Sequence, residues 1–175
     1  MTPIILIPAR MAAARLPGKP LADIAGAPMI VRVWRQAVAA EMGPVAVAAG
    51  DPEIVAAVSA AGGHAVLTDP ALPSGTDRVQ AALRLADADG RCDVVVNLQG
   101  DMPFIDPAAP RTCADLLARA PPSSIARIAL TTFALFRSAT DSSGETSVAI
   151  SQDGARASRS AQILGAAGSM KGMSP

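Results

Sequence analysis

The chain has 175 residues and 50% of them are hydrophobic, which suits one domain with a sizeable buried core. Fifteen basic and fifteen acidic side chains cancel, so the chain has no overall basic field that would hold nucleic acid or an anionic membrane surface. No apolar run approaches the roughly 20 residues of a membrane-spanning helix, and Pro8 and Arg10 cut the first apolar run, unlike a signal peptide, so we expect a cytoplasmic protein.

The first part of the chain predicts strands that alternate with helices. An unbroken apolar run at 4–7, ended by Pro8, is typical of a parallel strand covered on both faces. Apolar residues then recur at helical spacing over 28–41, where Pro28 is placed to begin the helix. Further strands are predicted at 45–49, 65–68 and 93–98, and further helices after Asp51-Pro52, over 76–86 with Thr76 as N-cap, and over 108–120.

This alternation predicts an α/β fold with a Rossmann-like, mostly parallel sheet and helices on both faces. Ligands of such sheets bind beyond the carboxyl ends of the strands, so we expect a site close to Ile7, Ala49, Thr68 and Leu98. Beyond about Leu130, Ser, Ala, Gly and Thr dominate the sequence. We expect the tail over 131–175 to be poorly structured, because it buries too little apolar surface to offset its ordering entropy.

The loop after the first predicted strand carries Arg10, Arg15 and Lys19 with small residues between them. A fork-shaped Arg, a point-charge Lys and free backbone N–H groups suit a polyphosphate. Lys19 is the only lysine before Lys171, which favours a specific task for it. The loop matches neither G-x-G-x-x-G nor the P-loop pattern, which argues against a dinucleotide oxidoreductase or a P-loop kinase. The spacing alone does not decide between two interpretations of this loop, a phosphate site and a solvated basic loop without a ligand.

Two further segments carry polar groups where ligands of a parallel sheet are expected. Asp101 ends the motif over 97–101 and can hold Mg²⁺, which takes one or two carboxylates together with phosphate oxygens, or it can simply cap a turn. Gln99 can hydrogen-bond a sugar or a base. The loop over 73–78 enters a helix, so its N–H groups can contact a base or ribose and Arg78 can reach a phosphate, although capping alone also explains it.

Taken together, these segments resemble the CMP-Kdo synthetases, also called 3-deoxy-manno-octulosonate cytidylyltransferases. The segments agree with that family in order and separation over about 1–130, and they are Ile5-Leu6-Ile7-Pro8-Ala9-Arg10, Arg15-Leu16-Pro17-Gly18-Lys19-Pro20-Leu21, Asp23-Ile24-Ala25-Gly26, Pro28-Met29-Ile30, Pro73-Ser74-Gly75-Thr76-Asp77-Arg78, Val96-Asn97-Leu98-Gln99-Gly100-Asp101, Pro103 and Ile105-Asp106-Pro107. The resemblance implies a Rossmann-like nucleotidyltransferase domain over 1–130. It also implies an Mg²⁺-dependent transfer of CMP from CTP to Kdo, with release of pyrophosphate, in lipopolysaccharide biosynthesis.

The resemblance also implies roles for single residues. Arg10, Arg15 and Lys19 would hold the triphosphate as the catalytic residues, and Asp101 would bind Mg²⁺. The substrate contacts would come from Pro8, Ala9, Ser74, Gly75, Arg78 and Gln99, of which Gln99 would help to place the sugar.

The chain departs from the family at two points. Met102 stands where the family usually has an acidic residue. Members are also considerably longer, and their second half supplies sugar contacts, a second metal-binding Asp and much of the dimer surface. Because the agreement fades near Leu130, we interpret 131–175 as an out-of-frame or truncated segment and expect a CTP site with an incomplete Kdo site. The alternatives are another sugar nucleotidyltransferase, such as a CMP-sialic acid synthetase, and a non-catalytic nucleotide-binding remnant.

Overall fold

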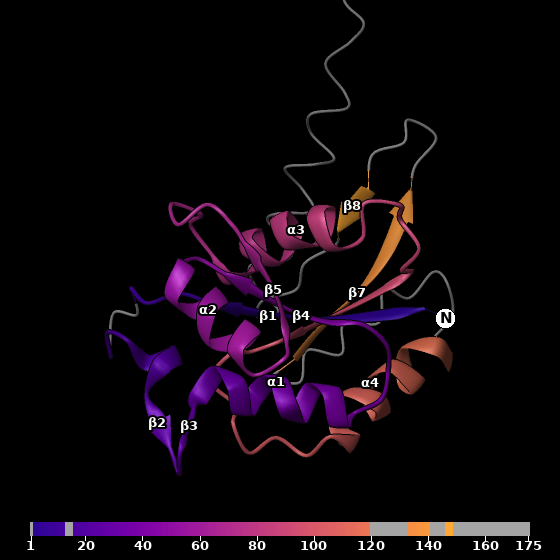
Figure 1. Cartoon of the computed structure of the whole chain (residues 1–175). Coiled ribbons are helices and arrows are strands. Elements are labelled where there is room, and N and C mark those ends of the chain that lie inside the picture. Colours follow the sequence, from indigo (N-terminus) through magenta and orange to yellow (C-terminus); the bar gives the residue numbers. More distant parts are fainter. Residues whose placement is uncertain (1, 13–15, 120–132, 141–145, 149–175) are drawn as a thin grey trace, which may run out of the picture.

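The structure, a computed structural model, describes residues 2–12, 16–119, 133–140 and 146–148 (Figure 1). Its centre is a six-stranded sheet in the order β5-β4-β1-β6-β7-β8. The four strands β5, β4, β1 and β6 are parallel to one another, whereas β7 pairs antiparallel with β6 and with β8. The strands are β1 Pro3–Ala9, β4 Val45–Ala49, β5 His64–Leu67, β6 Val94–Leu98, β7 Phe133–Thr140 and β8 Thr146–Val148.

Helices cover both faces of the sheet, as the sequence predicts (Figure 1). One core cluster joins Ile5 and Ile7 of β1 to α1, α2 and α4, and the other joins Ile4 and Leu6 to α3. Successive residues of a strand point to opposite faces, so the apolar run of β1 supplies both cores at once. The helices are α1 Met29–Ala39, α2 Pro52–Ala60, α3 Gly75–Ala86 and α4 Ala108–Arg119. None of the helices in the described ranges could cross a membrane.

Two elements lie in the long loop after β1, where the sequence predicted no regular structure. They are a 3-10 turn, η1 Lys19–Leu21, and a small hairpin of β2 Asp23–Ile24 with β3 Ala27–Pro28. Arg32 of α1 donates hydrogen bonds to the carbonyl oxygens of Ile24 and Ala25 and so fixes the hairpin against the helix. The turn and the hairpin together bring Lys19 back over the end of the sheet.

The sheet continues past the boundary that the sequence suggested near residue 130. Strand β7 pairs with β6 over five positions, from Val94 opposite Arg137 to Leu98 opposite Phe133. Residues 120–132, 141–145 and 149–175 lie outside the described ranges, so the expected disorder of the tail stays a prediction for them.

The N-cap of α3 is Ser74, and the prediction of Thr76 is wrong. Ser74 has an extended backbone (φ −136°, ψ 162°), and its Oγ accepts a hydrogen bond from the N–H of Asp77 at 3.1 Å. The same hydroxyl donates to Oδ2 of Asp77 at 2.5 Å. Thr76 is instead buried within the first turn of the helix. The motif thus caps its helix two residues earlier than propensity indicated, because Asp77 stands at the third helical position.

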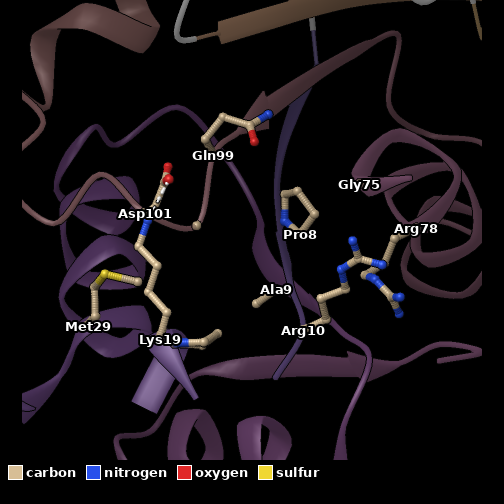
Figure 2. A pocket seen from close by; sticks show the side chains of 11 residues that line it. Pro8, Ala9, Arg10, Lys19, Met29, Gly75, Arg78, Gln99 and Asp101 are labelled. Carbon is tan, nitrogen blue, oxygen red and sulfur yellow. Dashed lines mark hydrogen bonds and ion pairs between the residues drawn. The ribbon is translucent and has the colours of Figure 1, made fainter. Parts of the chain in front are cut away.

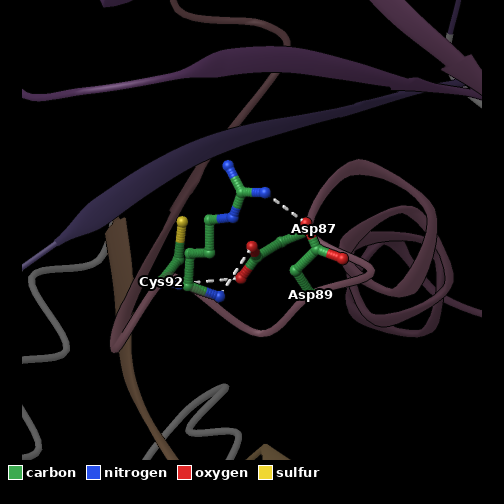
Figure 3. Close-up of polar contacts among 4 residues, drawn as sticks. Asp87, Asp89 and Cys92 are labelled. Atoms are coloured by element: carbon green, nitrogen blue, oxygen red, sulfur yellow. Dashed lines mark hydrogen bonds and ion pairs between the residues drawn. The ribbon is translucent and has the colours of Figure 1, made fainter.

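The loop between α3 and β6 is closed by one carboxylate (Figure 3). Asp87 accepts hydrogen bonds from the backbone N–H groups of Arg91 at 2.9 Å and Cys92 at 2.8 Å. Gly90 takes the left-handed conformation that this tight turn requires (φ 63°). Burial, followed by the charge and hydrogen bond of Asp87, raises the pKa of the Cys92 thiol to about 11. Cys92 and Cys113 are both buried free thiols.

Replacing Ser74 by Ala should lower the free energy of unfolding by about 1 kcal/mol, because the N–H of Asp77 loses its capping partner. Ser74→Thr keeps a hydroxyl at the same position and should stay close to the unaltered chain. Urea unfolding measures both changes. Equal stability of the Ala variant would show that this cap contributes nothing.

Cys92 should titrate at about pH 11 in the folded protein, well above the value of 9.0 for an ordinary thiol. Between pH 9 and pH 11 the Cys92 thiol keeps its proton in the folded chain and has lost it in the unfolded chain. The contribution of this thiol to the free energy of unfolding is therefore complete below about pH 9 and disappears as the pH rises towards 11. Ultraviolet thiolate absorbance of a Cys113→Ser variant reports this titration without tyrosinate, since the chain has no Tyr. A transition near pH 9 would contradict the expectation.

Candidate functional site

A cavity of about 250 Å³ opens at the carboxyl ends of the central strands (Figure 2). Its walls come from the end of β1, from η1, from the first turns of α1 and α3 and from the loop after β6. This is the edge of the sheet at which the sequence predicted a site. The lining residues are Pro8, Ala9, Arg10, Lys19, Pro20, Met29, Gly75, Arg78, Gln99, Gly100 and Asp101.

Two glycines permit the close packing that shapes the cavity. A Cβ atom on Gly100 would lie 2.6 Å from the carbonyl oxygen of Pro8, closer than any side chain could approach. A Cβ atom on Gly50, just after β4, would lie 2.8 Å from a guanidinium nitrogen of Arg78. At Gly100 the neighbour is backbone, so the strand ends can approach each other only because this position lacks a side chain. At Gly50 a side chain would displace the Arg78 guanidinium from its present place.

Lys19 and Asp101 form an ion pair at the cavity, with 2.8 Å between Nζ and Oδ2 (Figure 2). The pair joins η1 to the loop after β6, which are far apart in the sequence. Gly18 precedes Lys19 in the left-handed conformation (φ 73°), and its N–H donates to the carbonyl oxygen of Met11 at 3.0 Å, which turns the chain into η1. Both side chains are partly exposed, 35% for Lys19 and 53% for Asp101, so the pair stabilises the fold by at most about 1 kcal/mol.

Two arginines meet on the other side of the cavity (Figure 2). The Arg78 side chain is buried, with 1% exposure, and it donates to Oγ1 of Thr68 at 2.6 Å and to the carbonyl oxygen of Asp69 at 3.1 Å. Burial and then the nearby positive charge of Arg10 lower the pKa of Arg78, while Asp51 and Asp69 act against this shift. Arg10 is exposed and lies in the cavity wall. Two guanidinium groups this close favour an anionic ligand between them and Lys19.

Asp51 holds the start of the basic loop, a role that sequence reasoning missed. Its Oδ2 accepts a hydrogen bond from the backbone N–H of Met11 at 2.7 Å, although Asp51 also occupies the N-cap position of α2 and makes no capping bond there. The sequence indicated Asp51-Pro52 only as a helix start. A contact across 40 positions had no signal in the sequence.

Most of the predicted site residues meet in this cavity, although their roles stay predictions. Ser74 is absent from the lining residues, because its hydroxyl caps α3. Arg15 lies outside the described residues. The predicted residues that line the cavity are Pro8, Ala9, Arg10, Lys19, Gly75, Arg78, Gln99 and Asp101, and those not predicted are Pro20, Met29 and Gly100.

The cavity offers one carboxylate for a metal ion. Among the described residues no three His, Cys, Asp or Glu side chains gather into a group that could hold a metal ion, and Asp101 is the one acidic side chain in the described lining. A single carboxylate fits Mg²⁺, which keeps several waters and takes its other ligands from substrate phosphates. It does not fit a structural zinc site, which needs four protein ligands.

Comparison with known proteins places the chain in one family. A model of the cytidylyltransferase family matches residues 4–162, and so runs past the point near residue 130 where the resemblance was expected to fade. Two relatives are 3-deoxy-manno-octulosonate cytidylyltransferases. The one from Rhodospirillum rubrum is 66% identical over 105 residues, which cover 60% of this chain and 42% of the relative. The one from Parvibaculum lavamentivorans is 56% identical over 129 residues, covering 74% and 50%.

Solved structures give the same result for the fold. A CMP:2-keto-3-deoxy-manno-octonic acid synthetase complexed with CTP matches with a TM-score of 0.57 and 42% identity, covering 67% of this chain and 46% of that one. A cytidylyltransferase from Leptospira borgpetersenii matches with a TM-score of 0.51 and 25% identity, covering 73% and 52%. The chain thus spans about half the length of the proteins it matches. With most of its residues matched by the family model, the chain belongs to the cytidylyltransferase family.

Proposed function

We propose that the cavity binds CTP with Mg²⁺, and that the chain carries the nucleotide-binding part of a 3-deoxy-manno-octulosonate cytidylyltransferase. The observation that carries the proposal is the meeting of Arg10, Lys19 and Asp101 at one cavity, at the carboxyl ends of β1 and β6. Cations on two sides and a carboxylate suit a metal-bound triphosphate. The names of the relatives, and the CTP with which the solved synthetase is complexed, support this choice of nucleotide.

The reaction would join the anomeric hydroxyl oxygen of Kdo to the α-phosphorus of CTP. The bond from the α-phosphorus to the α,β-bridging oxygen breaks, its electron pair leaves on pyrophosphate, and the hydroxyl proton is released to solvent. Arg10 and Lys19 would neutralise the charge that gathers on the triphosphate, and Arg78 would add a fixed positive charge behind them. Mg²⁺ bound at Asp101 would supply further neutralisation of the phosphate oxygens.

Ligand binding would require the Lys19–Asp101 pair to open. In the free chain these two groups neutralise each other at 2.8 Å. A triphosphate competes with Asp101 for Lys19, and Mg²⁺ competes with Lys19 for Asp101. Each ligand therefore releases the group that the other one needs, and we propose that nucleotide and metal bind in concert.

The acceptor side of the reaction is part of the same proposal. The chain spans about half the length of its relatives, and we propose Kdo as the acceptor from the names of those relatives. A cytoplasmic location, a step in lipopolysaccharide biosynthesis and a homodimer are part of the same proposal. The second candidate is a non-catalytic nucleotide-binding chain, which would bind CTP without releasing pyrophosphate.

CTP with Mg²⁺ should stabilise the chain against heat more than UTP, GTP or ATP do. A ligand at 100 times its Kd adds about 2.7 kcal/mol, which a thermal-shift assay detects. Pyrophosphate release on addition of Kdo is measured beside it. Equal stabilisation by all four nucleotides would contradict the choice of CTP, and the absence of pyrophosphate release would contradict the proposed transfer.

Lys19→Gln should weaken CTP·Mg²⁺ binding by about 10- to 100-fold, because a charged hydrogen bond to phosphate is lost. The same change should strengthen the binding of Mg²⁺ or Mn²⁺ alone, because Asp101 loses its counter-ion. Asp101→Asn should remove the metal dependence of CTP binding. Calorimetric titrations measure all three, with Arg84→Gln, an exposed change in the last turn of α3, as the control. If Lys19→Gln bound the metal as the unaltered chain does, Lys19 and the metal would not compete for Asp101.

A further inference from the structure

Strand β6 carries a polar residue in an otherwise apolar interior. Its five residues, Val94 to Leu98, are all buried, and Asn97 is only 1% exposed. Asn97 pairs with Leu6 of β1 on one side and with Ala134 of β7 on the other. Alternate residues of a strand share a face, so Asn97 lies on the side of Val95, which packs against α3.

The amide of Asn97 is incompletely bonded. Its Nδ2 has no hydrogen-bond partner, the one buried side-chain nitrogen or oxygen of the described residues of which this is true. A buried donor without a partner destabilises the folded state, and such groups are rare in native proteins. A valine or leucine would continue the apolar run and avoid this cost. Stability alone therefore does not account for an asparagine at this position, and residues that oppose stability are concentrated at functional sites.

The oxygen of the Asn97 amide is hydrogen-bonded to a residue that lines the cavity. Oδ1 of Asn97 accepts a hydrogen bond from Nε2 of Gln99 at 3.5 Å. Gln99 lines the cavity, and Figure 2 shows its side chain at the rim between Asp101 and Pro8. With Nε2 directed to Asn97, Oε1 of Gln99 accepts no hydrogen bond from the described residues and is open to a ligand. An acceptor at this place suits a ligand group that donates, and a hydroxyl is the donor that a sugar offers.

We infer that Asn97 is a positioning residue, which holds the Gln99 amide so that its oxygen accepts a hydrogen bond from a sugar hydroxyl of the bound substrate. This inference rests on the proposed function, because the hydroxyl belongs either to the ribose of the nucleotide or to the acceptor sugar. Asn97 acts through Gln99 and makes no contact with the ligand itself. The unpaired Nδ2 lowers the stability of the folded chain, and this loss accompanies an amide placed at the end of a buried strand.

The test is a double-mutant cycle of Asn97→Leu and Gln99→Ala on the whole chain. Leucine keeps the branch at Cγ and removes both polar atoms. We expect Asn97→Leu to unfold at an equal or higher urea concentration and yet to lose about two- to tenfold in affinity for the hydroxyl-bearing ligand. In the Gln99→Ala background the same change should cost no further affinity. Val95→Leu, on the same face of the same strand, controls for repacking.

Calorimetry with three ligands separates the two sources of the hydroxyl. A loss seen with CTP but not with 2′-deoxy-CTP or 3′-deoxy-CTP assigns Gln99 to the ribose. A loss seen only when Kdo is added to the CTP-saturated chain assigns it to the acceptor sugar.

Two results would overturn the role of Asn97. One is a fall in unfolding stability together with an affinity loss that persists in the Gln99→Ala background, as expected of a purely structural residue. The other is equal affinity of Asn97→Leu and the unaltered chain for every ligand. If the unaltered chain bound no CTP, the proposed function would fail first and the role of Asn97 with it.

Discussion

The cavity depends on the close packing of β1 against β6 at their carboxyl ends. Gly100 passes the carbonyl oxygen of Pro8 at a distance that leaves no room for a Cβ atom. This crossing brings together three segments that are distant in the sequence: the loop after β1, the first turn of α3 and the loop after β6. The apolar strands, buried on both faces, therefore fix the place of the polar groups, which contribute little stability themselves.

The three positive charges in the described lining of the site differ in how freely they can move. Arg78 is buried and bonded to Thr68 and Asp69, so its charge stays in place whatever binds. Lys19 has one exposed partner, Asp101, which a ligand can replace. Arg10 is exposed at the edge of the same cavity. A fixed charge behind two movable ones reduces the reorganisation that a polyanion requires on binding, which is the condition for effective electrostatic stabilisation.

The sequence predicted the parallel strands and the long helices, because their apolar periodicity is strong and local. It predicted the meeting of Lys19 with Asp101 at one edge only through the general rule for parallel sheets. The capping role of Ser74 was harder to predict, because a cap and a ligand contact use the same small polar residues. The bond from Met11 to Asp51 and the unpaired amide of Asn97 depend on contacts across the fold, to which no local pattern corresponds.

Nucleotide binding and transfer make different demands on the site in the proposed reaction. The described residues that line the cavity all lie between Pro8 and Asp101, and the strands that support them, β1, β4 and β6, end by Leu98. The described walls of the cavity thus rest on the parallel part of the sheet. Nucleotide binding requires only these lining residues and their charges. Transfer asks in addition for an acceptor held in line with the α-phosphorus, and misplacement by about 1 Å can lower such a rate 100-fold. For the proposed reaction, the charges of the described cavity bear on nucleotide binding, whereas transfer depends in addition on how the acceptor is held.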